Sequence, residues 1–329
     1  MNKTIRVISI VFLAIILVMY FQLAISRSNK TSAEKGSHAK HHMQIIYSNP
    51  NTCFFSEFHR GARAAEAELD IYVEFIEADK WETAGVLYSV RKGIHTGADG
   101  VAFSLNDRES ITKMITTADS FDTQLILYQG DYDGTQMIPT IGVNAYQIGY
   151  KAGTLALETF SGNCKIAVVI DSMLSAEASG EGSMQLEGIL SALNGVKNAV
   201  ITGIYPLEVD VMRGQKMANS LLSEPNNFNV IICLNELTTA IIARRMEDLG
   251  LSDIKIIGYG AVPLTIKYIE QGSIYASLFP DAYSIGYGTV SSMSAMLSGE
   301  MVVPDSYIEL LVIDKTNVSD FIAEMAAAD

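Results

Sequence analysis

Short apolar runs rich in β-branched residues alternate with longer amphipathic stretches from residue 43 onward. Apolar runs of four to eight residues are typical of buried strands, and the longer stretches repeat their apolar residues at helical spacing. The predicted strands are 44–48, 72–77, 100–104, 124–128, 140–143, 165–170, 199–205, 229–234, 255–259 and 274–279. The predicted helices are 54–69, 82–95, 107–120, 145–160, 183–193, 210–223, 237–249, 262–271 and 283–297.

This alternation of strand and helix predicts an α/β protein with doubly wound parallel sheets. The pattern runs twice, because residues 97–104 lead into a helix that opens at Asp107, and residues 227–234 lead into one that opens at Glu236. Ligands of such sheets bind beyond the carboxyl ends of the strands. Two lobes that face each other with those ends would form a cleft between them.

Length and charge agree with two lobes and exclude a nucleic-acid partner. The chain has 329 residues, of which 49% are hydrophobic, and single cores stop growing at roughly 250–300 residues. Residues 1–40 hold six Lys or Arg and one Glu, which leaves 17 basic and 36 acidic residues beyond them, a net charge of −19. A surface of that sign repels phosphate backbones and favours solubility.

The N-terminal segment predicts a single membrane crossing. Lys3 and Arg6 precede an apolar run at 7–25, which at ~1.5 Å per residue nearly spans a hydrocarbon core of ~30 Å. The run is longer than the about 7–15 residues of a signal-peptide core, although 24–26 is a weak candidate cleavage site. We expect residues 1–25 to form a cytoplasmic tip and transmembrane anchor, and the polar residues 26–42 to form a flexible linker.

Signatures of metal sites and enzymes are missing from the sequence. The three cysteines form no CxxC pair, and the histidines of 38–42 have no matching carboxylate or cysteine partner. The chain has no GxxxxGK[ST] loop, GxSxG elbow, HExxH motif or complete dinucleotide fingerprint. We therefore predict a protein that is not an enzyme and that holds no metal or cofactor.

Several motifs resemble one family over residues 43–314. The stretch SNPNTCFF at 48–55, followed by Gly61, resembles a first strand and helix opening of the type I periplasmic binding proteins. This group includes the ribose-, galactose- and xylose-binding proteins. Further residues that fall where the family keeps comparable ones are Asn144, Gly149, Gly153, Gly188, Asn235, Glu236, Gly258 and the run 282–287.

The resemblance implies two lobes joined by a three-strand hinge. The first lobe is expected to comprise 43–144 plus 280–304, and the second 145–279 plus 305–329. The chain should then cross between the lobes near 144–145, 279–281 and 303–307.

The chain departs from the family at the expected ligand site. Sugar binders of this kind commonly hold hydroxyls with an Asp-Arg pair after the fourth strand, an Arg near the sixth, an Asp after the ninth and a Gln before a Pro-Tyr element. The corresponding places here are Gln129 with Gly130, Ser183 or Gln185, Gly260, and Pro280. No Arg falls in the predicted cleft loops, so an anionic ligand would lack its bidentate partner. A neutral or a cationic ligand is favoured.

The candidate ligand-binding residues are aromatic rings suited to the C–H faces of a sugar, and amides or carboxylates suited to its hydroxyls. They are Asn51, Phe54, Phe55, Gln129, Asp131, Asn144, Glu177, Gln185, Asn235, Glu236, Tyr259, Phe279 and Asp281. Alternatives stay open for some of them. Phe54 or Phe55 could pack in the core, and Asn144 could instead satisfy hinge backbone groups.

The predicted function is an extracytoplasmic sugar-binding protein on the cell membrane. The expected ligand is a small neutral monosaccharide, for which a pentose such as xylose is one candidate. Closure around the sugar would be reported to a membrane sensor histidine kinase, and the alternative is the substrate-binding component of a sugar ABC transporter, which would dock on a permease. Cytoplasmic sugar-responsive repressors share the two-lobed core, but they carry an N-terminal helix-turn-helix and a basic DNA face that this chain lacks.

Overall fold

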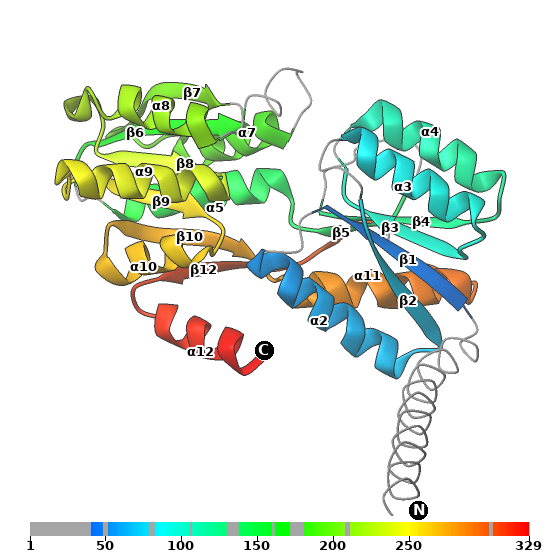
Figure 1. Ribbon diagram of the computed structural model, residues 1–329. Helices are drawn as coiled ribbons and strands as arrows, with labels where there is room; N and C mark the ends of the chain where they lie inside the picture. Colours follow the sequence, from blue (N-terminus) through cyan, green and yellow to red (C-terminus); the bar gives the residue numbers. More distant parts are fainter. Residues whose placement is uncertain are drawn as a thin grey trace, which may run out of the picture.

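The chain forms two lobes, each built around a six-stranded sheet with helices on both faces (Figure 1). The computed structural model describes residues 41–48, 52–78, 83–105, 107–129, 138–159, 162–171, 181–207, 211–302 and 305–328. The predicted fold class, two doubly wound lobes with mainly parallel sheets, is confirmed.

The sheet of the first lobe has the order β11-β5-β4-β3-β1-β2, and all of its pairings are parallel. Its strands are β1 (His41–Tyr47), β2 (Ile71–Glu77), β3 (Gly100–Phe103), β4 (Gln124–Tyr128), β5 (Thr140–Gly142) and β11 (Asp305–Tyr307). Ala102 packs with α2 (Cys53–Glu68) and α11 (Ala282–Leu297) on one face. Val101 and Phe103 pack with α3 (Thr83–His95) and α4 (Arg108–Asp119) on the other. Because both faces are covered, β3 is apolar along its whole length.

The sheet of the second lobe has the order β12-β10-β9-β8-β6-β7. Its strands are β6 (Cys164–Asp171), β7 (Ala199–Leu207), β8 (Val230–Cys233), β9 (Lys255–Tyr259), β10 (Ile274–Pro280) and β12 (Leu310–Asp314). One face is covered by α5 (Ala145–Glu158) and α7 (Glu181–Leu193), and the other by α8 (Val211–Leu221), α9 (Glu236–Leu249) and α10 (Pro263–Gln271). A short 3-10 turn (Pro225–Asn227) precedes β8, and α12 (Val318–Ala328) ends the described chain. Only β12 runs antiparallel to its described neighbour, β10.

Glycines allow one pair of helices in each lobe to pack closely. A Cβ atom on Gly61 of α2 would lie 2.0 Å from the carbonyl oxygen of Tyr283 on α11. A Cβ on Gly149 of α5 would lie 1.8 Å from the carbonyl oxygen of Gln185 on α7. No side chain fits at such distances, so these two positions need glycine for the helices to approach each other.

The chain passes between the two lobes after β5, after β10 and between β11 and β12. The third passage differs from the predicted boundary. Residues 305–307 were expected in the second lobe, but β11 pairs with β5 of the first sheet, and the Ile308 amide donates to the Gly142 carbonyl oxygen at 2.7 Å. The prediction was wrong here because a three-residue strand carries too little pattern to indicate which sheet it joins.

The first strand begins earlier than predicted. His41 and His42, which the sequence assigned to the linker, are the first two residues of β1, and the His42 amide donates to Asp99 Oδ2 at 2.7 Å. The predicted anchor and the rest of the predicted linker lie outside the described residues. None of the helices within the described ranges combines the length and apolar character needed to cross a bilayer.

Candidate functional site

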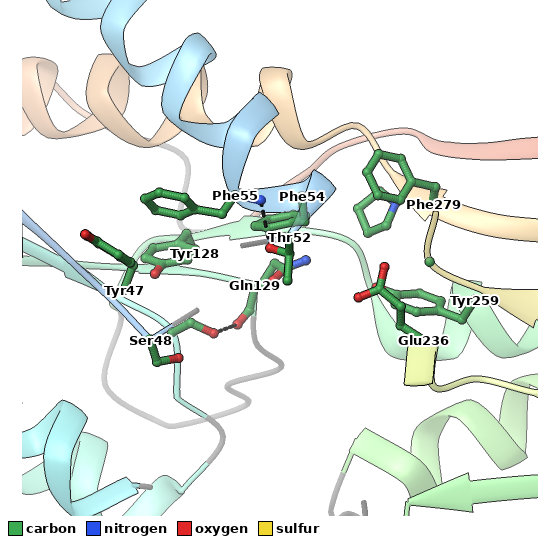
Figure 2. A pocket seen from close by; sticks show the side chains of 13 residues that line it. Tyr47, Ser48, Thr52, Phe54, Phe55, Tyr128, Gln129, Glu236, Tyr259 and Phe279 are labelled. Carbon is green, nitrogen blue, oxygen red and sulfur yellow. Dashed lines mark hydrogen bonds between the residues drawn. The ribbon is translucent and has the colours of Figure 1, made fainter. Parts of the chain in front are cut away.

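A cavity of about 260 Å³ lies between the lobes, at the carboxyl ends of strands from both sheets (Figure 2). The first lobe lines it with residues that end β1, β3 and β4 or begin α2: Tyr47, Ser48, Thr52, Phe54, Phe55, Ser104, Tyr128 and Gln129. The second lobe lines it with residues that begin α9 or end β9 and β10: Glu236, Tyr259, Gly260, Phe279 and Pro280. This is the edge at which doubly wound sheets bind ligands.

Aromatic rings form the wall on the side of the first lobe. The Phe55 ring lies 4.2 Å from the Tyr47 ring and stands edge-on to Phe75 at 6.2 Å, measured between centroids. The first turn of α2 is held by Thr52, whose Oγ1 accepts a hydrogen bond from the Phe55 amide at 3.1 Å. Phe54 packs against the hydrophobic cores of both lobes. The start of α2 therefore presents half-buried rings to the gap between the lobes.

Tyr128 presents its ring but not its hydroxyl to the cavity. The hydroxyl donates to the carbonyl oxygen of Ile46 at 2.7 Å, and complete burial raises the pKa of this phenol. The Tyr128 ring lies 4.5 Å from that of Phe58, so the floor of the aromatic wall is continuous with the core of the first lobe. A ligand would meet this residue as an apolar surface.

Among the described residues of the first lobe, Gln129 is the amide side chain that lines the cavity. Its φ of 49° lies in the left-handed region, which costs a non-glycine residue of order 1–3 kcal/mol. Two hydrogen bonds hold the conformation, from Ser104 Oγ to the Gln129 carbonyl oxygen at 2.8 Å and from the Gln129 amide to the Ile141 carbonyl oxygen at 3.0 Å. The backbone groups of Gln129 are thus hydrogen-bonded within the first lobe, while its side-chain carboxamide extends toward the gap in Figure 2.

Tyr259 and Phe279 form the opposite wall. They stand near the ends of neighbouring strands β9 and β10, and Phe279 is braced by an edge-on contact with Phe321 at 5.6 Å. The Tyr259 amide is held by Thr239 Oγ1 at 3.2 Å. The cavity is therefore bounded by aromatic rings from both lobes.

Glu236 is the carboxylate within this lining, and Figure 2 shows it pointing into the gap. Its Oε1 accepts from the Ala261 amide at 3.1 Å. Burial raises the pKa of the Glu236 carboxyl, and the bond from Ala261 opposes that shift. A Cβ on Gly260, whose φ is +85°, would lie 2.4 Å from Glu236 Cγ. Gly260 stands where sugar binders of the family commonly have an Asp, and the Glu236 side chain occupies the space next to it.

Six predicted site residues line the cavity together: Phe54, Phe55, Gln129, Glu236, Tyr259 and Phe279. Three others, Asn51, Asp131 and Glu177, lie outside the described residues.

Four further predicted residues lie elsewhere in the described structure. Asn144, Asn235 and Asp281 are the N-caps of α5, α9 and α11, and their side chains accept from the amides of Gln147, Thr238 and Ser284. Gln185 is buried where α7 crosses α5 at Gly149. The three asparagine and aspartate residues do follow strand ends, as predicted, but in the structure their side chains cap helices. Gln185 lies at a contact between two helices and not in the cavity lining.

Seven lining residues were not among the predicted site residues: Tyr47, Ser48, Thr52, Ser104, Tyr128, Gly260 and Pro280. Most of them end or directly follow a strand, so position at a carboxyl end was the available signal. Tyr47 and Tyr128 were missed because each lies within a predicted strand, where an aromatic residue is equally typical of the hydrophobic core.

Within the described ranges, no group of three or more His, Cys, Asp or Glu side chains is arranged to hold a metal ion. Cys164 and Cys233 are buried, and burial raises the pKa of both thiols. These cysteines therefore serve as packing groups.

Comparisons with known proteins agree with this geometry. The family profile described as a periplasmic binding protein domain matches residues 44–301. The ribose import binding protein RbsB of Escherichia coli K12 is 19% identical over 277 residues, which cover 84% of this chain and 92% of that protein.

Solved structures share the fold at low sequence identity. GanP, a glucose-galactose binding protein from Geobacillus stearothermophilus, superposes with a TM-score of 0.77 at 20% identity and covers 84% of this chain and 98% of its own. A solute-binding protein of an ABC transporter from Actinobacillus succinogenes 130z, with bound D-allose, has a TM-score of 0.76 at 16% identity and covers 85% of this chain and 100% of its own. A chain of a XylFII-LytSN complex has a TM-score of 0.72 at 19% identity and covers 84% of this chain and 98% of its own.

Two parallel-sheet lobes, three connecting segments and a cavity between facing strand ends define a two-lobed solute-binding protein. The chain belongs to the periplasmic binding protein domain family, as the match over 44–301 shows. It is a binding protein and not an enzyme.

Proposed function

We propose that the protein binds one monosaccharide in the cavity between its lobes and closes around it. The observation that carries this proposal is the lining itself, in which aromatic rings from both lobes face each other across polar groups of Gln129 and Glu236. Aromatic faces suit the C–H faces of a sugar ring, and amide and carboxylate groups suit its hydroxyls. The related proteins that bind ribose, glucose, galactose or allose support the same ligand class.

The cavity suits a small ligand. Its volume of about 260 Å³ lies below the range of about 300–1,000 Å³ typical of pockets for drug-sized molecules. Among the described lining residues, none is a Lys, Arg or His that would form an ion pair with a carboxylate or phosphate. A single sugar without an anionic group therefore fits best, and a neutral pentose such as xylose is one candidate.

A ligand screen by thermal melting tests this proposal on the full-length protein in detergent. A ligand at about 100 times its Kd adds about 2.7 kcal/mol to the free energy of unfolding. We expect a rise in Tm with at least one sugar from a panel of pentoses, hexoses, amino acids and furanosyl compounds of the autoinducer type. A rise with an amino acid and with none of the sugars would contradict the proposal.

We also propose that residues 7–25 anchor the domain outside the cell membrane. The apolar length of this segment supports the anchor, and the match to a periplasmic family supports an extracytoplasmic domain. Because His41 and His42 belong to β1, the linker is residues 26–40, and about 15 flexible residues would give the domain a reach of roughly 19–23 Å. A receptor in the same membrane would then meet it at a high effective concentration, so even a weak contact would suffice.

The proposed output is signalling to a sensor histidine kinase. The similarity to a XylFII-LytSN complex supports a protein partner for this chain. The alternative output, delivery of sugar to an ABC permease, is supported by the ABC transporter solute-binding protein with bound D-allose and by RbsB.

Two observations on cells separate these outputs. Mass spectrometry of the mature N-terminus should find residues 7–25 retained, and crosslinking should yield a sugar-dependent adduct with a histidine kinase. Cleavage after Ser26, or sugar-dependent adducts with a permease alone, would favour transport.

A further inference from the structure

The charges that line the cavity do not balance. Glu236 is the acidic side chain of the lining, and none of the described lining residues is Lys, Arg or His. In the sequence, residues 130–137 and 172–180 also contain no basic residue, whereas they hold Asp131, Asp133 and Glu177. The chain itself therefore offers no cation in these segments to pair with Glu236.

The basic side chains of α2 next to the aromatic wall have other partners. Arg60 forms an ion pair with Glu57, and its guanidinium carbon lies 4.2 Å from the centroid of the Tyr283 ring. His59 packs against Phe75 at 4.4 Å, and burial together with the Arg63 guanidinium lowers the pKa of its imidazole. Neither residue lines the cavity.

Closure around a ligand would remove water from Glu236. A carboxylate buried without a partner costs several kcal/mol, and otherwise takes up a proton. The bond from the Ala261 amide occupies Oε1 and supplies no compensating charge. A positive charge on the ligand would supply it.

The aromatic lining adds a second attraction for a cation. Six of the thirteen lining residues are Phe or Tyr. A cation within about 6 Å of a ring centroid gains about 0.5–2 kcal/mol, and the larger figure applies where water is excluded. An ammonium group beside Glu236 would lie among these rings.

We infer that the ligand is a monosaccharide that carries one protonated amino group, which binds Glu236 within the aromatic walls. This inference rests on the proposed function, since it specifies the class of sugar. The absence of arginine from the predicted cleft loops favoured a neutral or a cationic ligand, and this inference selects the cationic one.

Calorimetry on the full-length protein with matched sugar pairs tests the inference. The pairs are D-glucosamine with D-glucose and D-galactosamine with D-galactose, and N-acetyl-D-glucosamine and choline complete the set. In at least one pair we expect the amino sugar to bind about tenfold more tightly than its neutral parent. N-acetylation, which removes the charge, should abolish that advantage.

Two variants assign the preference to Glu236. Glu236→Gln keeps the shape and the acceptor for the Ala261 amide but removes the negative charge, so the tenfold ratio between amino-sugar and neutral-sugar affinity should fall to about one. The matched control is Glu270→Gln, an exposed carboxylate of α10 outside the cavity lining, which should leave the ratio unchanged.

Other outcomes separate this inference from the proposed function. Neutral sugars that bind as tightly as amino sugars, or a preference that survives in Glu236→Gln, would overturn the inference and leave sugar binding intact. Binding of a pentose or hexose from the melting panel without binding of either amino sugar would likewise overturn the inference alone. Choline binding without any sugar binding, or no binding by any sugar of the set or of that panel, would overturn the sugar proposal and the inference with it.

Discussion

Asn235 and Glu236 are neighbours in the sequence with different roles in the structure. Asn235 Oδ1 accepts from both the amide and the hydroxyl of Thr238 at 3.0 Å, whereas Glu236 lines the cavity. A residue at the N-cap directs its side chain back over the first turn of its own helix. The carboxylate that follows it is free of that constraint and can reach the gap between the lobes.

Asn235→Ala should therefore reduce stability more than binding. Loss of an N-cap acceptor costs about 0.5–2 kcal/mol, and we expect a drop of that size in the free energy of unfolding, measured by urea denaturation. Sugar affinity should change by less than about threefold, with Asn144→Ala, the cap of α5, as the matched control. A large loss of affinity at unchanged stability would show that Asn235 contacts the ligand.

Glu236 should make the stability of the ligand-free protein depend on pH. Because burial raises the folded-state pKa of this carboxyl above its unfolded value, the folded state binds the proton more tightly. Its contribution to stability is present below the unfolded pKa and is lost as the pH rises through the folded pKa. Glu236→Gln should thus gain stability relative to the native protein as the pH rises from 4 to 7, in melts at each pH. An equal difference at every pH would contradict this, and Glu270→Gln is the control.

The site could be predicted only where chemistry and position coincide. Phe55 and Glu236 combine a suitable side chain with a place in the first turn of a helix that follows a strand, and the sequence analysis included both among the candidates. Asn144 and Asp281 have the same signal but cap helices. Tyr128 belongs to the lining through its ring alone, and sequence cannot tell which face of a buried strand residue borders a cavity.

At the scale of elements, the glycine contacts explain why the paired helices approach so closely. α5 and α7 cross with Gly149 against the Gln185 backbone, and α2 and α11 cross with Gly61 against that of Tyr283. Such contacts fix the distance between helices on one face of each sheet. They thereby support the strand ends at which the cavity lies.

Gly149→Ala should destabilise the second lobe. A Cβ placed 1.8 Å from the Gln185 carbonyl oxygen forces the helices apart, and overpacking of this kind costs about 1–3 kcal/mol. Gly162→Ala is the matched control, because its added Cβ would meet no heavy atom within 4 Å. Urea denaturation should show the loss for the first variant only, and equal stability of the two would show that α5 and α7 can move apart at no cost.

Elements with a strong apolar pattern were predicted well, whereas the three-residue strand β11 was assigned to the wrong lobe. β4 and β9 have the predicted bounds because continuous apolar runs mark strands buried on both faces. Residues 305–329 were all expected in the second lobe, but β11 belongs to the first sheet and β12 to the second. The pairing of β11 with β5 depends on tertiary contacts that no local pattern records.

The whole molecule places its ligand site between two bodies joined by three segments. Each lobe contributes aromatic rings, and Phe54 packs against the cores of both. A ligand that contacts both walls favours the closed arrangement by its differential affinity for that state. The repeated strand and helix pattern predicted two lobes and their order along the chain. Which residues face each other across the gap depends on how the three connecting segments orient the lobes, and no local pattern in the sequence records that.

The central claim is that a monosaccharide binds between these aromatic walls, and isothermal titration calorimetry on the full-length protein tests it most directly. The sugar panel is titrated into the native protein and into Phe55→Ala, with Phe121→Ala, an exposed ring outside the cavity, as control. We expect one sugar to bind at one site per chain, with affinity reduced about tenfold (~1.4 kcal/mol) by Phe55→Ala and unchanged by Phe121→Ala. Sugar binding that Phe55→Ala leaves unchanged, or no sugar binding at all, would contradict the claim.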